Sequence, residues 1–329
     1  MDVGLTPQEL KEFELEIFDL FAQAKIASPV HLRGGNEKQL IEIYKNIKPE
    51  DYCFCTWASH LECLLKGVPR EQVRAAILRN KSICLSFKEH NIISSAIVGG
   101  SAPLAVGTAM GLKMQHKKQH VWAFIGDMTF YTGTVQEAIR YSEVHDLPIT
   151  FVVADNKHSV TTPTAEVGGN DIRRLSEASS KCVYYSYENE FPHAQSFENI
   201  PVDRRIEMPV AENLQLGLST GLALTGYVPV SVFPRWNFLL LASDQLVNHL
   251  DKLRLITEGQ YSPKVIIRVA VGVRKPVDPQ EQHVGDFTEG FQKIVQTIDI
   301  VKLNTAAAYR KAYERDDGIS TILVEEHQF

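Results

Sequence analysis

The chain contains 329 residues, 44% of them hydrophobic, so it is long enough for two domains with substantial cores. The formal net charge is −6 and no long basic run occurs, which makes nucleic acid and an anionic membrane unexpected partners. No apolar run approaches the roughly 18 residues that span a bilayer. The first five residues lack a signal-peptide pattern, so we expect a cytoplasmic protein.

The N-terminal part carries the pattern of an amphipathic helix. Thr6, Pro7 and Glu9 form a capping box with proline at the first helical position. The apolar residues that follow fall on one stripe: Leu10, Phe13, Ile17, Leu20, Phe21 and Ala24. Such a stripe predicts a face that packs on a core or on another subunit.

A second helix, rich in small residues, is predicted at residues 102–112, after Gly99 and Gly100. Small side chains let another helix or a cofactor approach the backbone closely. The segment is compatible with both a helix packing contact and a cofactor contact.

A strand–loop–helix–strand unit follows. Residues 121–125 and 149–153 are apolar runs that predict buried strands, and residues 133–146 have helical spacing. Asp127 follows the first strand and Asn156 follows the second. If these strands are parallel neighbours, both side chains reach the sheet edge where open α/β sheets bind ligands. Their oxygens suit Mg²⁺ or Ca²⁺, often completed by a ligand's phosphates.

Beyond this unit the pattern changes. Residues 168–200 are predicted to form a linker or a loop that covers a cofactor, without a regular element. A second α/β pattern then begins at Ile206. It predicts a helix from Glu212 to Leu222, a strand at 228–233, a helix at about 240–256 and a strand at 264–270.

The unit around Asp127 resembles the GDG…NN signature of thiamine-diphosphate enzymes, most closely the α chains of 2-oxo acid dehydrogenase E1 components. The positions that match the family's spacing without a gap are Gly126, Asp127, Gly133, Glu137, Pro148 and Asn156. Met128 replaces a glycine of the signature and Asp155 replaces its first asparagine. The alternative is an ordinary βαβ unit with a surface aspartate and asparagine.

The resemblance implies a cofactor, thiamine diphosphate, and a metal, Mg²⁺, with Ca²⁺ or Mn²⁺ also possible. Asp127, the Asn156 side chain and the main-chain carbonyl of His158 would bind the metal, and Gly126 and Met128 would lie against the cofactor. The main chain at Ala96 and Val98 would bind the aminopyrimidine ring.

One expected phosphate contact is missing. Ala58 stands where the family carries an arginine that binds the diphosphate, and Glu62 replaces the second histidine of the same motif. His60, the first histidine, is kept and is a candidate catalytic residue. Losing the arginine removes a bidentate contact, so another base must compensate or the metal must hold the diphosphate.

The second half resembles the pyrimidine-binding domain of E1 β chains. Glu212 ends the matching motif 208–212, so it would contact N1′ of the aminopyrimidine and should be buried with a raised pKa. The alternative is a first-turn residue favoured by the helix dipole. Phe238 would stack on the ring or be a core aromatic. His283 would face the substrate as an acid or base, or be a solvated loop histidine.

The resulting fold class is α/β, with two thiamine-diphosphate-binding-fold domains, each a mainly parallel sheet flanked by helices. We expect a diphosphate domain at 1–185, a linker at 186–200 and a pyrimidine domain at 201–329, as in fused E1 α and β chains, in the order of transketolase. The superfamily implies a homodimer or a higher even oligomer. No third domain is expected, which makes docking to a lipoyl-bearing core less expected.

Three functions stay open. The first is a lyase or transferase that acts on a small carbonyl substrate, a 2-oxo acid or ketose, by decarboxylation or by acyl or ketol transfer to an acceptor. The second is an E1-like 2-oxo acid dehydrogenase component that works with a separate partner. The third is a thiamine-diphosphate-binding paralogue without turnover.

Overall fold

The computed structural model describes residues 4–160, 162–191, 200–303, 305–315 and 317–325. The chain divides into two units, Met1–Val210 and Ala211–Phe329. The expected linker at 186–200 falls mostly on residues 192–199, outside the described residues. Both units have mainly parallel sheets flanked by helices, which confirms the expected fold class.

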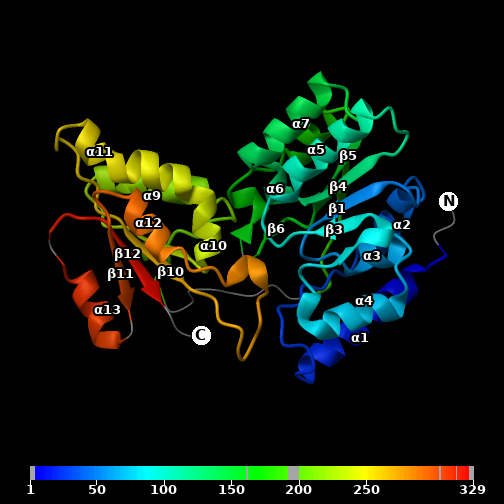
Figure 1. Ribbon diagram of the computed structural model, residues 1–329, viewed down its shortest axis with the longest axis horizontal. Helices are drawn as coiled ribbons and strands as arrows, with labels where there is room; N and C mark the ends of the chain where they lie inside the picture. The colour runs from blue at the N-terminus through cyan, green and yellow to red at the C-terminus, as the bar shows by residue number, and fades with distance from the viewer. Residues whose placement is uncertain (1–3, 161, 192–199, 304, 316, 326–329) are drawn as a thin grey trace. The chain divides into compact units, whose positions relative to one another are not determined.

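The first unit is built on a six-stranded sheet (Figure 1). Its strands, in sheet order, are β2 (Ser86–Phe87), β3 (Ile92–Ser94), β1 (Tyr52–Cys55), β4 (Val121–Gly126), β5 (Ile149–Asp155) and β8 (Cys182–Ser186). Only β2 runs antiparallel to its neighbour; β3, β1, β4, β5 and β8 are parallel and therefore end at one edge. A small hairpin pairs β6 (His158–Ser159) with β7 (Thr162–Pro163).

Alternating side chains of this sheet face two separate cores, as a strand buried on both faces requires. In β4, Phe124 joins one core, whereas Ala123 and Ile125 join the other. The first core is covered by α1 (Pro7–Ala22), α2 (Glu37–Tyr44), α3 (His60–Leu65) and α4 (Arg70–Ala76), and the second by α5 (Ser101–Met114), α6 (Asp127–Phe130), α7 (Gly133–Val144) and α8 (Ile172–Glu177). Figure 1 shows the α1–α4 group and the α5–α7 group on opposite sides of the sheet.

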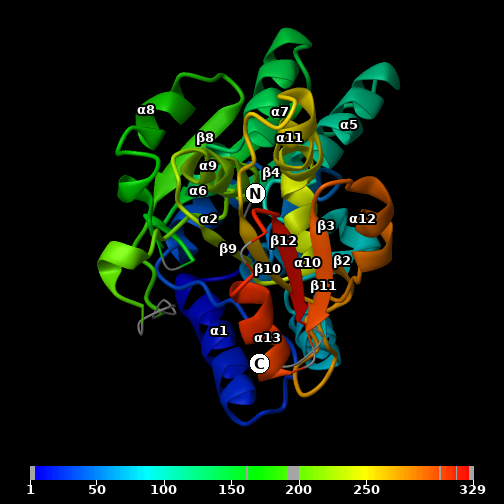
Figure 2. The same ribbon diagram turned by 90° about the vertical axis from the view of Figure 1, so that its left-hand side faces the viewer.

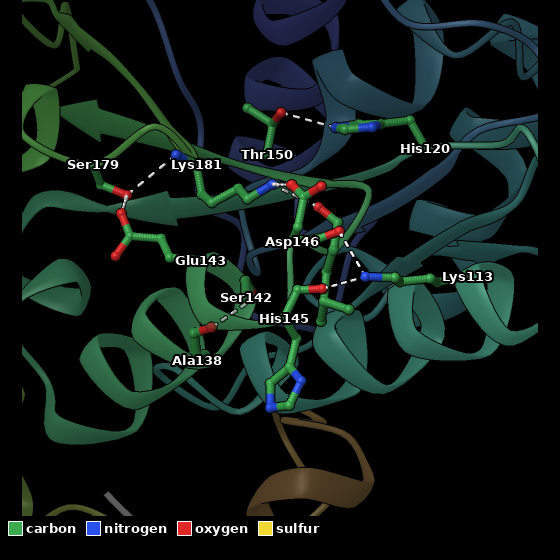
Figure 3. A network of polar contacts seen from close by, with 11 residues as sticks. Lys113, His120, Ala138, Ser142, Glu143, His145, Asp146, Thr150, Ser179 and Lys181 are labelled. Atoms are coloured by element: carbon green, nitrogen blue, oxygen red, sulfur yellow. Dashed lines mark hydrogen bonds and ion pairs between the residues drawn. The ribbon is translucent and has the colours of Figure 1, made fainter.

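The amino end of β5 is fixed by lysines from two other segments (Figure 3). Lys181 Nζ donates to Asp146 Oδ1 at 3.0 Å and to the Leu147 carbonyl at 2.9 Å. Lys113 Nζ, from the end of α5, donates to the His145 carbonyl at 2.5 Å. These bonds hold the turn between α7 and β5, and the candidate site residue Asn156 directly follows the other end of β5.

The second unit is built on a four-stranded parallel sheet in the order β11 (Asp299–Leu303), β12 (Thr321–Glu325), β10 (Ile266–Ala270), β9 (Val230–Phe233). Figure 2 shows β10, β11 and β12 side by side. The helices are α9 (Glu212–Leu224), α10 (Trp236–Leu239), α11 (Asp251–Ile256), α12 (Thr288–Ile294) and α13 (Ala306–Tyr313). Its main core packs Leu216, Phe233, Trp236 and Val269, whereas Leu323 and Tyr313 pack on the opposite face.

Short 3-10 and π turns complete both units. The 3-10 turns are Lys88–His90, Thr164–Glu166, Val202–Arg204, Leu240–Ala242 and Glu281–His283, and the π turns are Ile77–Lys81 and Gln245–Leu250. The helix predicted at 240–256 is therefore interrupted, with only its last part, α11, regular.

Two sequence expectations need correction. Residues 168–200 were expected to lack regular structure, but α8 and β8 lie there, because the Val- and Tyr-rich stretch pairs with the free edge of β5. The apolar stripe of α1 is buried at Leu10, Phe13, Ile17 and Leu20, whereas Phe21 is exposed and Ala24 lies past the helix end. Among the described residues no helix has the length and hydropathy to cross a membrane.

Candidate cofactor site

The carboxyl ends of β4 and β5 bring three oxygen-bearing side chains to one edge of the sheet. The strands pair in parallel register from Val121 with Ile149 to Gly126 with Ala154. Asp127 comes directly after Gly126, and Asp155 and Asn156 come directly after Ala154. The sequence prediction that Asp127 and Asn156 reach the same sheet edge is therefore consistent with the pairing.

Asp127 is buried, with 3% of its surface exposed, and both carboxyl oxygens accept hydrogen bonds. Oδ1 accepts from the Met128 amide at 2.7 Å and Oδ2 from Thr164 Oγ1 at 2.8 Å. Burial and, to a smaller extent, the neighbouring Asp155 carboxyl raise the pKa of Asp127 to about 7, although both hydrogen bonds act to lower it. A buried carboxyl beside a second carboxyl favours either a proton or a bound cation.

The turn after β5 fixes the other two oxygen-bearing side chains, Asp155 and Asn156. Asp155 Oδ2 accepts from the Tyr184 hydroxyl at 2.6 Å, and Oδ1 accepts from the Lys157 amide at 2.9 Å. Asn156 Oδ1 accepts from the His158 amide at 3.1 Å, which turns the chain back toward the β6–β7 hairpin. The side chain of Asn156 is thus held in one orientation, with a lone pair left on its oxygen.

This donor set fits a divalent oxygen-preferring cation. The carboxyl and carboxamide oxygens at this edge are hard ligands, and Asp155 lies close enough to Asp127 to raise its pKa. The described residues contain no group of three or more His, Cys, Asp or Glu side chains that could hold a metal. A metal here therefore needs the Asn156 oxygen, and the His158 carbonyl stays a predicted third protein ligand.

The loop expected to bind the aminopyrimidine follows β3 at the same edge. Ser95 N donates to the Cys55 carbonyl at 3.1 Å, which ties the loop to the end of β1. Ala96 is buried and Val98 half-buried, and Gly99 turns the chain into α5 with φ +71°. Ordinary side chains rarely adopt that backbone conformation, so the glycine suits this turn. The main-chain contacts of Ala96 and Val98 with a cofactor remain predictions.

His60 lies in a buried polar network. Its Nδ1 is 2.8 Å from Glu14 Oε1 and its Nε2 is 2.9 Å from Ser82 Oγ, and only 2% of the residue is exposed. Both ring nitrogens therefore already have partners inside the protein. This geometry favours a positioning role over the catalytic role predicted from the sequence.

In the second unit, Glu212 opens α9 and is 9% exposed. Burial raises the pKa of Glu212 to about 7, which confirms the expected burial and raised pKa of this carboxyl. A carboxylate favoured only by the helix dipole would have its pKa lowered. The environment therefore suits a carboxylic acid that is neutral near pH 7 and can donate a hydrogen bond.

Phe238 and His283 also come together in the second unit. Their rings meet edge to face with centroids 5.2 Å apart, and His283 Nδ1 is buried with no hydrogen-bond partner among the described residues. Burial lowers the pKa of His283, and the charge of Arg235 lowers it further. His283 is therefore held neutral beside an aromatic ring, instead of being a solvated loop histidine.

Comparison with known proteins decides the family. The pattern of the family described as dehydrogenase E1 component matches residues 7–173, just over half of the 329 residues. The chain belongs to this family. Membership in the E1 component family implies thiamine diphosphate as the cofactor.

Two curated relatives of this E1 family member are α subunits. The α subunit of an acetoin:2,6-dichlorophenolindophenol oxidoreductase from Bacillus subtilis (strain 168) is 27% identical over 165 residues, which cover 47% of this chain and 50% of that protein. The pyruvate dehydrogenase E1 component subunit alpha-3, chloroplastic, from Oryza sativa subsp. japonica is 26% identical over 219 residues, which cover 55% and 52%. The chain spans about half the length of these two relatives.

Several residues near the candidate site were not predicted from the sequence. Asp155 was treated as a neutral departure from the family pattern, yet it places a second carboxyl beside Asp127. Thr164, Tyr187 and Arg33 come from segments far from Asp127 in the sequence, and no motif marked them. The three tyrosines at 184, 185 and 187 were a usable signal for a buried strand end.

Proposed function

We propose that this chain is a thiamine-diphosphate- and Mg²⁺-dependent, E1-like enzyme that cleaves the bond next to the carbonyl group of a small 2-oxo compound. The observation that carries the proposal is the buried Asp127 carboxyl, held beside Asp155 and Asn156 at the carboxyl ends of two parallel strands. The family match over residues 7–173 supports the cofactor.

Each half supplies different chemistry in this proposal. Asp127, Asn156 and the His158 carbonyl bind the metal that holds the cofactor's charged tail. Glu212 keeps a proton near pH 7 and donates a hydrogen bond to the aminopyrimidine, as a β-like half would. When bound, the cofactor supplies a carbanion and an electron sink, and the protein orients it.

The relatives favour oxidative chemistry over free-standing carboligation. One curated relative is named for oxidising acetoin with a dye, and others are named as pyruvate dehydrogenase components. Acetoin and pyruvate are therefore the first substrates to test. With pyruvate, water and an oxidised dye, the expected products are acetate, CO₂ and the reduced dye.

Cofactor binding is the first test. Calorimetry with thiamine diphosphate should show binding that requires Mg²⁺, and Asp127→Asn should abolish it, because the variant removes the charged metal ligand. Asp146→Asn is the matched control, because it makes the same change on an exposed residue at the opposite end of β5. Absence of Mg²⁺-dependent binding to the unaltered chain contradicts the proposal.

Turnover is the second test. Reduction of 2,6-dichlorophenolindophenol with pyruvate or acetoin, without an aldehyde acceptor, supports the E1-like reaction. Aldehyde or carboligation product without dye reduction supports a lyase or transferase instead. Binding of the cofactor with no turnover on either substrate supports the non-catalytic paralogue.

A further inference from the structure

Arg33 reaches the place where the family's diphosphate arginine is missing. Its Nη2 donates to Thr56 Oγ1 at 2.7 Å, and Thr56 is the first residue after β1. The same hydroxyl oxygen accepts from the Ala58 amide at 3.4 Å. The Arg33 guanidinium therefore lies beside this motif, although Arg33 precedes Ala58 by 25 residues in the sequence.

This position is at the same sheet edge as the metal site. β1 and β4 are parallel neighbours, so Thr56 and Asp127 each follow the carboxyl end of a strand at this edge. Tyr187 follows β8 at that edge, and its amide donates to the Asp155 carbonyl at 2.9 Å. Burial raises the pKa of Tyr187, the charge of Arg33 lowers it, and Glu62, Asp127 and Asp155 raise it further. The Tyr187 hydroxyl is therefore within electrostatic range of Arg33 and of both Asp127 and Asp155.

Arg33 is held in place from two sides. Nη1 forms an ion pair with Glu62 Oε1 at 2.5 Å, and the Arg33 amide donates to Glu14 Oε2 at 2.8 Å. Burial lowers the pKa of Arg33, but Glu62 and the weaker charges of Tyr187, Tyr185 and Cys55 together leave the pKa raised, so the guanidinium stays charged. Its side chain is 11% exposed and Glu62 is fully buried.

Stability alone does not account for this ion pair, since a buried pair is often no more stabilising than apolar residues of equal volume. Glu62 Oε2 has no hydrogen-bond partner among the described residues, so the pair is not a fully satisfied structural network. Two of the five guanidinium N–H groups are accounted for by Glu62 and Thr56. The remaining donors can serve an anion.

We propose that Arg33 replaces the arginine missing at Ala58 and donates to the diphosphate of the cofactor, with Glu62 orienting its guanidinium. The inference rests on the proposed function, because it assigns a partner to the phosphates of the same cofactor. Arginine suits this role, since its planar fork matches phosphate oxygens in pairs.

The test compares binding of thiamine diphosphate and thiamine monophosphate, each with Mg²⁺, by calorimetry. The double variant Arg33→Met, Glu62→Gln removes both members of the pair, so no charge is left buried alone. We expect its affinity for the diphosphate to fall about 10- to 100-fold, the loss typical of charge-assisted hydrogen bonds. Its preference for diphosphate over monophosphate should shrink as well.

The matched control is Arg173→Met, Glu177→Gln, which makes the same changes in an exposed ion pair on α8 and should keep the original affinities. If the Arg33 double variant does not fold, Arg33→Lys carries the test. Lysine keeps the charge but loses the fork, so we expect about 3- to 10-fold weaker diphosphate binding.

The two proposals fail differently. If the unaltered chain binds thiamine diphosphate and the folded Arg33 variants bind it with unchanged affinity and preference, the role of Arg33 is wrong and the proposed function stands. If the unaltered chain does not bind it at all, the proposed function itself fails.

Discussion

At the scale of single residues, two buried carboxyls have similarly raised pKa values but different neighbours. Asp127 and Glu212 both have a pKa raised to about 7 by burial. Asp127 also faces a second carboxyl and accepts two hydrogen bonds, which prepares it for a cation. Glu212 has no such neighbouring carboxyl among the causes of its shift, so its surroundings favour the neutral acid. Environments of this kind separate a metal ligand from a proton donor.

The raised pKa of Glu212 predicts a pH-dependent stability. Its folded-state pKa of about 7 lies above the ordinary value of 4.5, so folding is favoured below pH 4.5 and this contribution is lost as the pH rises through 7. Glu212→Gln cannot ionise and should avoid that loss. Relative to the variant, the cofactor-free chain should lose up to about 3 kcal/mol of unfolding free energy between pH 4.5 and pH 8.

Urea unfolding at several pH values measures this difference. Glu289→Gln is the control, because Glu289 is an exposed carboxylate in the first turn of α12 in the same unit. Parallel pH profiles for the Glu212 variant and the unaltered chain would show that Glu212 ionises as freely in the folded state as in the unfolded state.

At the scale of elements, the sequence predicted structure best where contacts between residues close in sequence determine it. The capping box at the start of α1 forms as predicted, with the Glu9 amide donating to Thr6 Oγ1 at 3.2 Å and the Thr6 amide to Glu9 Oε2 at 2.8 Å. Strands β4 and β5 begin at the predicted residues, because uninterrupted apolar runs mark strands buried on both faces.

Nonlocal structure was harder to predict. β8 was missed because its exposed edge mixes polar and aromatic residues, and only pairing with β5 makes it a strand. Arg33 was missed because nothing near it in the sequence indicates that its side chain reaches Thr56. His60 matched a motif position, but its partners Glu14 and Ser82 come from distant segments and place it in a buried network.

The capping box provides a prediction at this scale. Thr6→Ala removes the acceptor for the Glu9 amide and should lower the unfolding free energy of the first unit by about 1 kcal/mol. Thr6→Ser keeps the acceptor oxygen and should have little effect. Because α1 carries Glu14, which accepts from the Arg33 amide, the loss should be visible in denaturant unfolding of the first unit. Equal stability of the alanine and serine variants would show that the cap contributes nothing.

At the scale of the whole molecule, one chain contains two α/β units, each with a mainly parallel sheet and its own candidate residues. The family match ends at residue 173, so the α-like character of the first unit is supported more strongly than the β-like character of the second. That second assignment depends on Glu212, Phe238 and His283, of which the last two pack together. The fused arrangement therefore stays a proposal.

The resemblance to the superfamily predicts that copies of this chain share cofactor sites. A ligand that binds the associated form and not the separate chain stabilises association in proportion to the logarithm of its concentration over its dissociation constant. Sedimentation velocity with thiamine diphosphate and Mg²⁺ should therefore show a species of twice the 37.0 kDa chain mass at protein concentrations where the cofactor-free chain begins to dissociate.

Asp127→Asn should lose this dependence on cofactor, because it cannot hold the metal, whereas Asp146→Asn should keep it. A species of 37.0 kDa at saturating cofactor, measured in a sample that binds the cofactor by calorimetry, would show that a single chain completes the site. Association could instead be complete without cofactor and identical in Asp127→Asn. Cofactor binding would then have no effect on association, and the chains would assemble through surfaces independent of the site.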